Sequence, residues 1–380
     1  MATGDRALLL LSQTFSDGGI QRFNRTLLAA SRQTPPRVDV LSLRDPPDAP
    51  AAARTGIGLL RGFQHRRGAF ALATWRALAS GRYRVVVIGH INLLMMALLA
   101  SCLTPFRPRM LLIAHGVEVW TGVGGPRRWA LRRMDRLLCV SRYTERMIQR
   151  QAPELPAAVF TIFPNALGET WQRGAPVVAD TVPASDAWPK RFLLAVARIE
   201  QPDRTKGIVT TIEALATCDD DTLQLVVAGS GGDLAFLRGV AARCGVSDRV
   251  HFAGRVTDEA LRELYARCIA FVLPSGQEGF GIVFLEAMYF GAPVIAARAK
   301  GAVDVIEDGV TGLLVDYGDI AALARAIDRI ARDKLMRTRL RNHARIQVVE
   351  GGAFNFGAYQ RRWHGILASC GVRVAEALPP

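Results

Sequence analysis

Two glutamates and several glycines follow a short apolar segment in the second half of the chain. Residues 273–293 read LPSGQEGFGIVFLEAMYFGAP, in which seven residues separate Glu278 from Glu286. Glycines let backbone amides approach a ligand, and a helix amino terminus adds about half a positive charge that attracts phosphate. Carboxylates repel phosphate, so we expect these two to bind hydroxyl groups. Amides for phosphate and carboxylates for hydroxyls together indicate a nucleotide-sugar pocket.

The segments on both sides of this loop must position the two glutamates. The apolar run at 269–273 is typical of a buried parallel strand. The apolar segment after Gly281 has the length of a helix, which Gly291 and Pro293 are expected to end. The glutamates would then bracket the junction between loop and helix.

The composition indicates a globular protein with an unevenly distributed charge. The chain has 380 residues, of which 50% are hydrophobic and 22% charged, which predicts two or three domains. Residues 1–190 carry 25 Lys and Arg against 12 Asp and Glu, whereas residues 191–380 carry 23 against 22. A basic half requires an anionic partner, and membrane lipid, a lipid diphosphate and nucleic acid are the candidates.

No segment indicates secretion or a membrane span. The first residues include an acid and only a short apolar run, unlike a signal peptide, and the longest apolar stretch, 91–103, is too short to cross a bilayer and predicts a buried helix. The six cysteines lack a C-x-x-C pair and are expected to be reduced core residues. We therefore expect a cytoplasmic protein whose basic half attaches peripherally to the inner face of the membrane.

Strand-like apolar segments alternate with helical segments along the chain. Alternation of this kind predicts an α/β protein with doubly wound parallel sheets and a ligand cleft at the carboxyl ends of the strands. Residues 166–190 are rich in Gly, Pro, Ala and Asp and are expected to link two domains. The predicted strands are 6–11, 37–43, 85–89, 110–114, 136–140 and 159–163 before this linker, and 192–197, 223–229, 250–254, 269–273, 293–297 and 312–315 after it.

The sequence EGFG inside the glutamate pair, with a strand before it and GAPVIA after it, resembles the E-x7-E signature of retaining glycosyltransferases of family 4. This resemblance covers nearly the whole chain and implies the GT-B fold, in which two Rossmann-like domains face each other across a cleft. It implies an acceptor-binding, membrane-facing domain at 1–175, a nucleotide-sugar-binding domain at 190–352, and a C-terminal helix in 353–380 that crosses back to the first domain.

The resemblance also implies roles for the loop residues. Glu278 would orient the sugar and stabilise positive charge at its anomeric carbon, and Glu286 would bind the ribose hydroxyls. The donor site would also include the residues between them, namely Gly279, Phe280, Gly281 and Ile282.

Two cations follow the first strand of the second domain, in the sequence ARIEQPDRTKG. The resemblance assigns Arg198 and Lys206 to the donor diphosphate, where such contacts are worth ~1.5–3 kcal/mol each. Because the diphosphate is also the leaving group, these cations would stabilise its charge as the glycosidic bond breaks. Ala197 stands where the family has a glycine, and two surface cations are the alternative interpretation.

Other candidate donor contacts lie after other strands. Gly18 and Gly19 match the GG that opens these enzymes, and their amides are expected to reach the donor phosphate across the closed cleft, although a tight turn alone would also explain them. Gly229, in VVAGSGGD, is expected to let the backbone approach the nucleotide. Arg255, in HFAGRV, lies where relatives place the loop that reads the base.

His115 ends a predicted strand in LLIAHGVEVW, a context that resembles bacterial exopolysaccharide mannosyltransferases. There the matching histidine contacts the donor sugar, and a structural histidine is the alternative. Glu118 and Trp120 are weaker candidates for contacts with the acceptor. Residues 219–221 are three aspartates that we interpret as a solvated turn, so we expect no metal cofactor.

Two basic segments are candidates for the membrane surface. Residues 126–136 are expected to form a helix with Trp129 and with Arg128, Arg132 and Arg136 on one face. Anionic lipid attracts each such cation by about 1 kcal/mol, so a few would give reversible attachment. Residues 54–80 mix arginines with apolar residues in the same way. A solvated helix face is the alternative for both.

The sequences HGVEVW and GGIQRF resemble mannosyltransferases of the xanthan and acetan pathways. Those enzymes transfer mannose from GDP-mannose to cellobiosyl-diphosphate-polyprenol through an α-1,3 bond. The alternative in the same family is a UDP-sugar-dependent glucosyl- or N-acetylglucosaminyltransferase. A different class, a basic membrane- or nucleic-acid-binding protein without catalysis, would explain the charge, but we find no known nucleic-acid-binding module. A GT-B epimerase or phosphorylase would not need the basic half.

Overall fold

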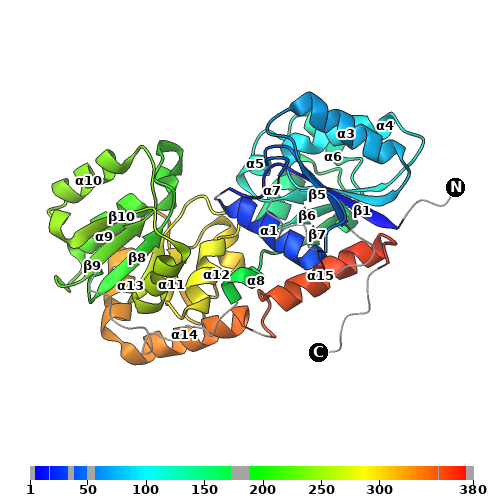
Figure 1. Ribbon diagram of the computed structural model, residues 1–380. Helices are drawn as coiled ribbons and strands as arrows, with labels where there is room; N and C mark the ends of the chain where they lie inside the picture. The colour runs from blue at the N-terminus through cyan, green and yellow to red at the C-terminus, as the bar shows by residue number, and fades with distance from the viewer. Residues whose placement is uncertain are drawn as a thin grey trace. The chain divides into compact units, whose positions relative to one another are not determined.

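The structure is a computed structural model that describes residues 5–16, 18–32, 38–48, 56–172, 188–349 and 351–373. The chain forms two compact units, which we call the N-terminal unit (1–170 with 353–380) and the C-terminal unit (171–352). Each unit contains one parallel sheet between layers of helices (Figure 1). The prediction of two Rossmann-like sheets is therefore confirmed. Most of the expected linker, 173–187, lies outside the described residues.

The sheet of the N-terminal unit has seven parallel strands in the order β3-β2-β1-β4-β5-β6-β7. The chain leaves β1 toward one edge and returns beside it as β4, so the strand order reverses between these two strands. The strands are β1 Arg6–Leu11, β2 Val38–Ser42, β3 Leu60–Gly62, β4 Tyr83–Ile88, β5 Arg109–Ala114, β6 Arg136–Cys139 and β7 Phe160–Ile162.

Helices cover both faces of this sheet, which is why its central strands are largely apolar, with Leu8–Leu11 and Val85–Ile88 fully buried. One face carries α3, α4 and α6, and the other carries α1 and α15 (Figure 1). The helical segments are α1 Gly19–Ser31, α3 Arg67–Ala79, η1 Ile91–Leu93, α4 Leu94–Cys102, α5 Val117–Trp120, α6 Gly125–Leu131, α7 Arg142–Gln151, η2 Ala157–Val159 and α15 Phe356–Ser369, with α8 Glu169–Gln172 at the boundary of the units.

The sheet of the C-terminal unit has six parallel strands in the order β10-β9-β8-β11-β12-β13, and its order reverses between β8 and β11. The strands are β8 Phe192–Val196, β9 Gln224–Ala228, β10 Val250–Gly254, β11 Ala270–Leu273, β12 Val294–Ala297 and β13 Gly312–Val315. The helical segments are η4 Gln201–Lys206, α9 Ile208–Thr217, α10 Leu234–Arg243, η5 Ser247–Arg249, α11 Asp258–Arg267, α12 Ile282–Tyr289, η6 Lys300–Asp304, α13 Ile320–Arg332 and α14 Lys334–Val348.

Two basic segments differ from the sequence prediction. Residues 54–80 do not form one helix, because their described part contains the edge strand β3, which pairs with β2, before α3 begins. The helix expected at 126–136 ends at Leu131 as α6, and Arg136 opens β6, where it pairs with Leu111 of β5. Pairing along the sheet prevails over the helical spacing of the arginines, so Arg136 does not share a helix face with Arg128 and Arg132.

Ser141 follows β6 and caps α7, since its hydroxyl accepts a hydrogen bond from the amide of Thr144 at 3.2 Å. The apolar stretch 91–103 forms η1 and α4, but it is not fully buried, because Leu99 is 53% and Leu103 74% exposed.

The C-terminal helix returns to the N-terminal unit, as the expected fold requires. Asn355 caps α15 by accepting from the amide of Ala358 at 2.6 Å, and α15 packs along α1 (Figure 1). The ring of Trp363 is fully buried beside Phe163, and its indole N–H donates to the hydroxyl of Ser31 at 3.0 Å. Trp363 therefore fixes α15 to the sheet and to α1.

Replacing Trp363 should destabilise the N-terminal unit. We expect Trp363→Ala to lower the free energy of unfolding by about 3–5 kcal/mol, because a large cavity forms and a buried hydrogen bond is lost. Urea unfolding measured by circular dichroism checks this. Trp129→Ala is the control: its ring is 39% exposed under the guanidinium of Arg133, so the expected cost is about 1 kcal/mol or less. Equal costs for the two variants would contradict the assignment of α15.

Candidate functional site

Lys206 and Glu278 meet where the strand order of the C-terminal sheet reverses. Lys206 ends η4 in the loop after β8, and Glu278 lies in the loop after β11, the neighbouring strand. Loops at the carboxyl ends of two such strands diverge to opposite sides of the sheet and leave a crevice in which ligands bind. The ammonium lies 2.8 Å from Oε2 of Glu278, and the two side chains are 23% and 14% exposed. The structure thus brings together two of the predicted site residues, partly shielded from water.

Close backbone contacts hold these two loops together. The amide of Gly276 donates to the carbonyl of Thr205 at 2.8 Å. Gly207, directly after Lys206, has φ +81°, and a Cβ there would lie 2.4 Å from the carbonyl oxygen of Pro274. Only glycine fits this left-handed, crowded position. The sequence TKG therefore fixes the lysine against the glutamate loop.

A third loop supports Glu278 from the side of β12. The amide of Gly301 donates to the carbonyl of Glu278 at 2.9 Å, and a Cβ at position 301 would lie 2.1 Å from the carbonyl oxygen of Gly279. Gly281, with φ +91°, is the N-cap of α12. The side chains of Phe280 and Ile282 are buried and anchor this turn. Within 278–282, only Glu278 and Gly279 keep part of their surface exposed.

Glu286 takes a different place from the one expected. It lies within α12 with no exposed surface, and its carboxylate accepts a hydrogen bond from the hydroxyl of Tyr265 at 3.0 Å. A carboxylate without exposed surface does not reach ribose hydroxyls, so this arrangement does not support that role. The buried pair instead joins α12 to α11.

Arg198 pairs with an aspartate of its own loop. Its side chain is 76% exposed and forms an ion pair with Asp203 at 3.3 Å. Among the described residues, no contact joins Arg198 to Lys206 or Glu278. Nearby Arg204 binds Asp233 through two hydrogen bonds of 2.6 and 2.7 Å, which lower the pKa of that carboxyl. Asp233 holds Arg204 in the loop after β8.

Gly229 serves the fold rather than open access to a ligand. It follows β9 with φ +148°, and a Cβ there would lie 1.8 Å from the carbonyl oxygen of Ala197, which follows β8. Its amide donates to the carbonyl of Gly254 at 2.8 Å. The backbone at Gly229 therefore approaches neighbouring loops, where we expected it to approach a nucleotide. Arg255 follows Gly254 and is exposed at the carboxyl end of β10.

Gly18 and Gly19 follow β1 and open α1 in the N-terminal unit. Gly18 is the N-cap with φ +139°, and a Cβ there would lie 2.3 Å from Oε1 of Gln21. A Cβ on Gly19 would meet no heavy atom within 4 Å. Gly18 is thus explained by the turn, whereas Gly19 leaves open space beside its amide.

His115 joins the loops that follow β4 and β5. Its Nε2 hydrogen-bonds the carbonyl of Gly89 at 2.9 Å, and its ring meets the edge of Phe23 at 4.8 Å between centroids. The carboxylate of Glu118 accepts from the amides of His115 and Gly116 at 2.6 and 3.1 Å. Burial lowers the pKa of His115 and of His90, whose rings are 6.4 Å apart. Both rings are therefore neutral near pH 7, and Glu118 orders the loop.

The acceptor and membrane candidates around α6 need two corrections. Trp120 is only 5% exposed, and its indole N–H donates to Thr144 at 3.2 Å, so it is a core residue rather than an acceptor contact. Arg128 and Arg132 both bind Glu154, and their hydrogen bonds, chiefly that of Arg128, lower its pKa to about 2. One carboxylate thus offsets part of the charge expected on this face, and Arg136 lies in β6.

The described residues contain no group of three or more His, Cys, Asp or Glu side chains placed to hold a metal ion. Asp219 forms an ion pair with Arg332, and Asp220 forms one with Arg191. The two aspartates lie before the amino end of β9. None of the helices in the described parts of the chain is long and apolar enough to cross a membrane.

Sequence reasoning missed Tyr265, Gly207 and Gly301, and it missed a pocket near β1 and β4. A glycine that follows a strand was the available signal for Gly207 and Gly301. The contact between Tyr265 and Glu286 joins residues of different helices and left no local signal.

Two family descriptions match most of the chain in succession. Residues 17–167 match "Glycosyltransferase Family 4", and residues 185–347 match "Glycosyl transferases group 1". Among solved structures, a complex of Anabaena Alr3699/HepE with UDP superposes with a TM-score of 0.74 at 19% identity, covering 95% of this chain and 99% of the other. Sucrose-phosphate synthase from Thermosynechococcus elongatus superposes with a TM-score of 0.75 at 23% identity, covering 96% and 98%.

Curated relatives are similar over part of their length. The lipopolysaccharide core biosynthesis glycosyltransferase LpsE of Rhizobium meliloti is 38% identical over 164 residues, which cover 43% of this chain and 46% of the relative. A GDP-mannose-dependent alpha-(1-6)-phosphatidylinositol monomannoside mannosyltransferase of Mycobacterium tuberculosis is 37% identical over 138 residues, which cover 34% and 36%. These matches thus span less than half of either relative.

Gly229→Ala should destabilise the C-terminal unit. A methyl group there would overlap the carbonyl of Ala197, and φ +148° is unfavourable for alanine, so we expect a loss of about 2 kcal/mol or more in urea unfolding. Gly239→Ala in α10 is the control, because its Cβ would meet only the end of the Arg243 side chain, at 3.5 Å, and alanine favours helix by up to about 1 kcal/mol. A Gly229→Ala protein as stable as the native one would refute this role.

Stability should depend on pH through His115. Because its folded pKa lies below the ordinary 6.5, the stability of the neutral form is present above pH 6.5 and is lost as the pH falls. We expect His115→Asn to reduce the difference in unfolding free energy between pH 7.5 and pH 5. Phe23→Leu, which removes packing against the same ring but no titrating group, should lower stability equally at both pH values. An undiminished difference in His115→Asn would contradict the assignment.

Proposed function

Both units of this chain have the fold of the group 1 and family 4 glycosyltransferases, and from this premise we propose that it is a retaining hexosyltransferase. It would take the sugar from a nucleotide-diphosphate donor and keep the anomeric configuration. Support comes from the two family matches in succession and from the similarity to solved GT-B glycosyltransferases. The solved Anabaena relative holds UDP, so the fold accommodates the nucleotide of such a donor in that protein.

The contact between Lys206 and Glu278 carries this proposal. Breaking the glycosidic bond leaves negative charge on the diphosphate and positive charge at the anomeric carbon. The ammonium and the carboxylate lie 2.8 Å apart at the carboxyl edge of the sheet and are partly shielded from water. Each of them would stabilise the opposite charge that develops as the bond breaks. We assign Lys206 to the leaving diphosphate and Glu278 to the sugar. Mutual pairing holds both groups in place, which reduces the reorganisation required when the donor binds.

The proposed donor is GDP-mannose. The HGVEVW segment resembles mannosyltransferases, and one of the relatives, from Mycobacterium tuberculosis, is by name GDP-mannose-dependent. That protein acts on a phosphatidylinositol monomannoside, and LpsE takes part in lipopolysaccharide core biosynthesis, so both names imply glycolipid acceptors. For this chain we propose a cellobiose-type oligosaccharide on polyprenyl diphosphate, extended by an α-1,3 bond in exopolysaccharide synthesis. Its site of action would be the inner face of the cell membrane.

A second candidate is a UDP-sugar-dependent glucosyl- or N-acetylglucosaminyltransferase. The observation that favours it is the Anabaena structure, which was solved with UDP-glucose as well as with UDP. The residues that we assign to the diphosphate and the sugar would be the same in both cases. The base and the sugar hydroxyls alone would separate the two donors.

Glu278→Ala should abolish transfer without unfolding the protein. We expect less than about a tenth of the native rate, because removing one charge placed for a transition state costs roughly 10²–10³ in rate. Nucleotide release is measured with GDP-mannose, UDP-glucose and UDP-N-acetylglucosamine in the presence of a polyprenyl-diphosphate disaccharide. Glu263→Ala is the control, since this glutamate pairs with Arg267 on α11 of the same unit.

The outcomes separate the candidates. Release of GDP alone supports the mannosyl donor, and release of UDP alone supports the second candidate. A Glu278→Ala protein that keeps more than a tenth of the rate would remove this carboxylate from the mechanism. Release of neither nucleotide under any condition would argue against a transferase.

A further inference from the structure

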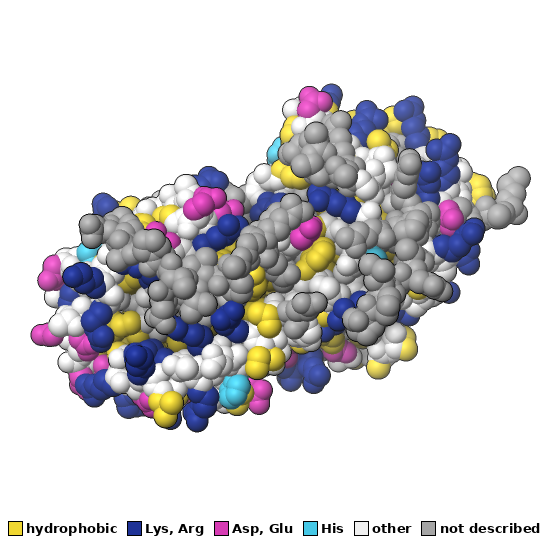
Figure 2. Space-filling model, turned by 60° about the horizontal axis from the view of Figure 1, so that its bottom comes forward, with side chains coloured by type: hydrophobic (Ala, Val, Ile, Leu, Met, Phe, Trp, Pro, Cys, Tyr) yellow, Lys and Arg dark blue, Asp and Glu magenta, His cyan; other side chains and the backbone are white. Residues whose placement is uncertain are grey.

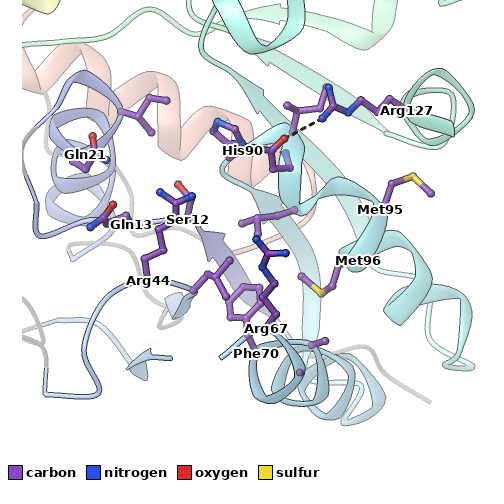
Figure 3. A pocket seen from close by; sticks show the side chains of 17 residues that line it. Ser12, Gln13, Gln21, Arg44, Arg67, Phe70, His90, Met95, Met96 and Arg127 are labelled. Carbon is purple, nitrogen blue, oxygen red and sulfur yellow. Dashed lines mark hydrogen bonds between the residues drawn. The ribbon is translucent and has the colours of Figure 1, made fainter. Parts of the chain in front are cut away.

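A pocket of about 790 Å³ opens in the N-terminal unit where its strand order reverses between β1 and β4. Its walls come from the loops after β1, β2 and β4 and from α1, α3, α4 and α6, which are far apart in the sequence (Figure 3). The volume lies within the range of about 300–1,000 Å³ that small-molecule sites occupy. It is a second candidate binding site, in a different unit from Lys206 and Glu278.

Three arginines give this pocket its charge, and we call it the arginine pocket. Arg44 follows β2, Arg67 opens α3 and Arg127 lies in α6, and all three line the cavity (Figure 3). No Asp or Glu is among the lining residues. Neither Arg44 nor Arg67 forms an ion pair with an acidic residue in the described part of the chain. In the same described part, the guanidinium of Arg127 donates to the neutral amide of Asn92, at 3.2 Å.

The positive field of the pocket affects His90, which also lines it. Burial is the main cause that lowers the pKa of His90; the charge of Glu118 opposes this shift, whereas His115, Arg44 and Arg127 add to it. The sequence from 49 to 117, which includes α3 and α4, contains nine arginines and not a single Asp or Glu. Outside that stretch, Asp45 follows Arg44, and its carboxylate accepts hydrogen bonds from Ser42 and from the amides of Thr14 and Phe15. Three cations around one cavity attract an anion with several oxygens, and guanidinium groups bind phosphate in bidentate geometry.

Apolar side chains also line the pocket, and α3 and α4 expose others. Met95 and Met96 of α4 face the cavity (Figure 3), and the same helix exposes Leu99 beyond it. The helix that carries Arg67 likewise exposes Leu72 and Trp75. The two helices pack together, and the indole of Trp75 reaches the carbonyl of Leu103 at 3.5 Å. Exposed apolar side chains on adjoining helices are typical of a binding surface.

We propose that the arginine pocket binds the phosphate or diphosphate group of an amphiphilic acceptor. Its apolar chain would lie along the exposed side of α3 and α4, over Leu72, Trp75, Leu99 and Leu103. This inference rests on the proposed function and names the residues that would recognise its lipid-linked substrate. It also moves the membrane-facing surface from α6, where Glu154 offsets the arginines, to α3 and α4.

The charge distribution favours this ligand over nucleic acid. Figure 2 shows one face of the molecule, on which Lys and Arg side chains appear over both units and not as one continuous track. Nucleic-acid sites follow a backbone with an extended row of cations and stacking aromatic rings. In the arginine pocket, three cations and two methionines line one cavity. This arrangement suits a compact anionic head group on an apolar chain.

Farnesyl diphosphate and inorganic pyrophosphate are the probes, and isothermal titration calorimetry of the full chain gives both dissociation constants. We expect farnesyl diphosphate to bind at least tenfold more tightly than pyrophosphate. Arg44→Ala and Arg67→Ala should each raise the dissociation constants of both ligands about tenfold. Arg361→Ala is the control: this exposed arginine lies in α15 of the same unit, outside the pocket, and its loss should change neither constant.

The double variant Leu99→Ser/Leu103→Ser tests the apolar surface separately. It should weaken farnesyl diphosphate about tenfold and leave pyrophosphate unchanged, because it removes contacts with the chain only. Both leucines are more than half exposed, so we expect the variant to fold, and an unchanged thermal unfolding midpoint checks this. Equal affinities of native protein for the two ligands would overturn the proposal of an amphiphile.

Failure of this inference is distinguishable from failure of the proposed function. The titrations contain no sugar donor, so they report on the arginine pocket alone. Sugar transfer that proceeds unchanged in Arg44→Ala and Arg67→Ala would overturn the pocket assignment and leave the transferase intact. Specific binding of farnesyl diphosphate without any nucleotide release would support the pocket and reject the transferase. If Arg361→Ala weakened binding as much as Arg67→Ala does, the effect would come from the overall charge of the protein. That result would overturn the inference.

Discussion

The reversal of strand order within each parallel sheet is the constraint on which the candidate sites depend. At that point, two neighbouring strands send their following loops to opposite sides of the sheet, and the backbone between them is left open. In the C-terminal unit the reversal lies between β8 and β11 and brings Lys206 to Glu278, although 71 residues intervene. In the N-terminal unit it lies between β1 and β4, where the arginine pocket opens. Topology thus decides where the candidate sites lie in both units.

Glycines convert this topology into a defined geometry. Gly207, Gly229 and Gly301 each stand where a Cβ would lie within 2.5 Å of a carbonyl oxygen on another loop. Such close backbone contacts leave little freedom for the loops that carry Lys206 and Glu278. A site that must stabilise separating charges gains from this rigidity, because preorganised groups require little rearrangement during the reaction. The glycines therefore act through position, and the charged side chains act on the ligand.

Charge is distributed between the two units according to what each would bind. In the C-terminal unit, several exposed arginines are paired, as Arg204 is with Asp233 and Arg298 with Asp308. In the N-terminal unit, Arg67 lies in the stretch 49–117, which lacks acids, and the lining of the pocket contains no Asp or Glu that would offset its three arginines. Ion pairs leave a surface stable and nearly neutral, whereas unpaired cations attract anions. The location of Glu154 beside Arg128 shows why a count of arginines alone misplaces the basic surface.

The sequence alone determined the fold class, nearly all the strands and the loop that carries Glu278, because apolar periodicity and glycine spacing are local signals. It placed Lys206 near that loop only through a family resemblance. Tertiary structure decided the rest: the edge strand β3, the end of α6 before Arg136, the burial of Glu286 against Tyr265 and of Trp120 in the core, and the convergence of Arg44, Arg67 and Arg127. Each of these depends on contacts between residues far apart in the chain, whose energies local patterns do not contain.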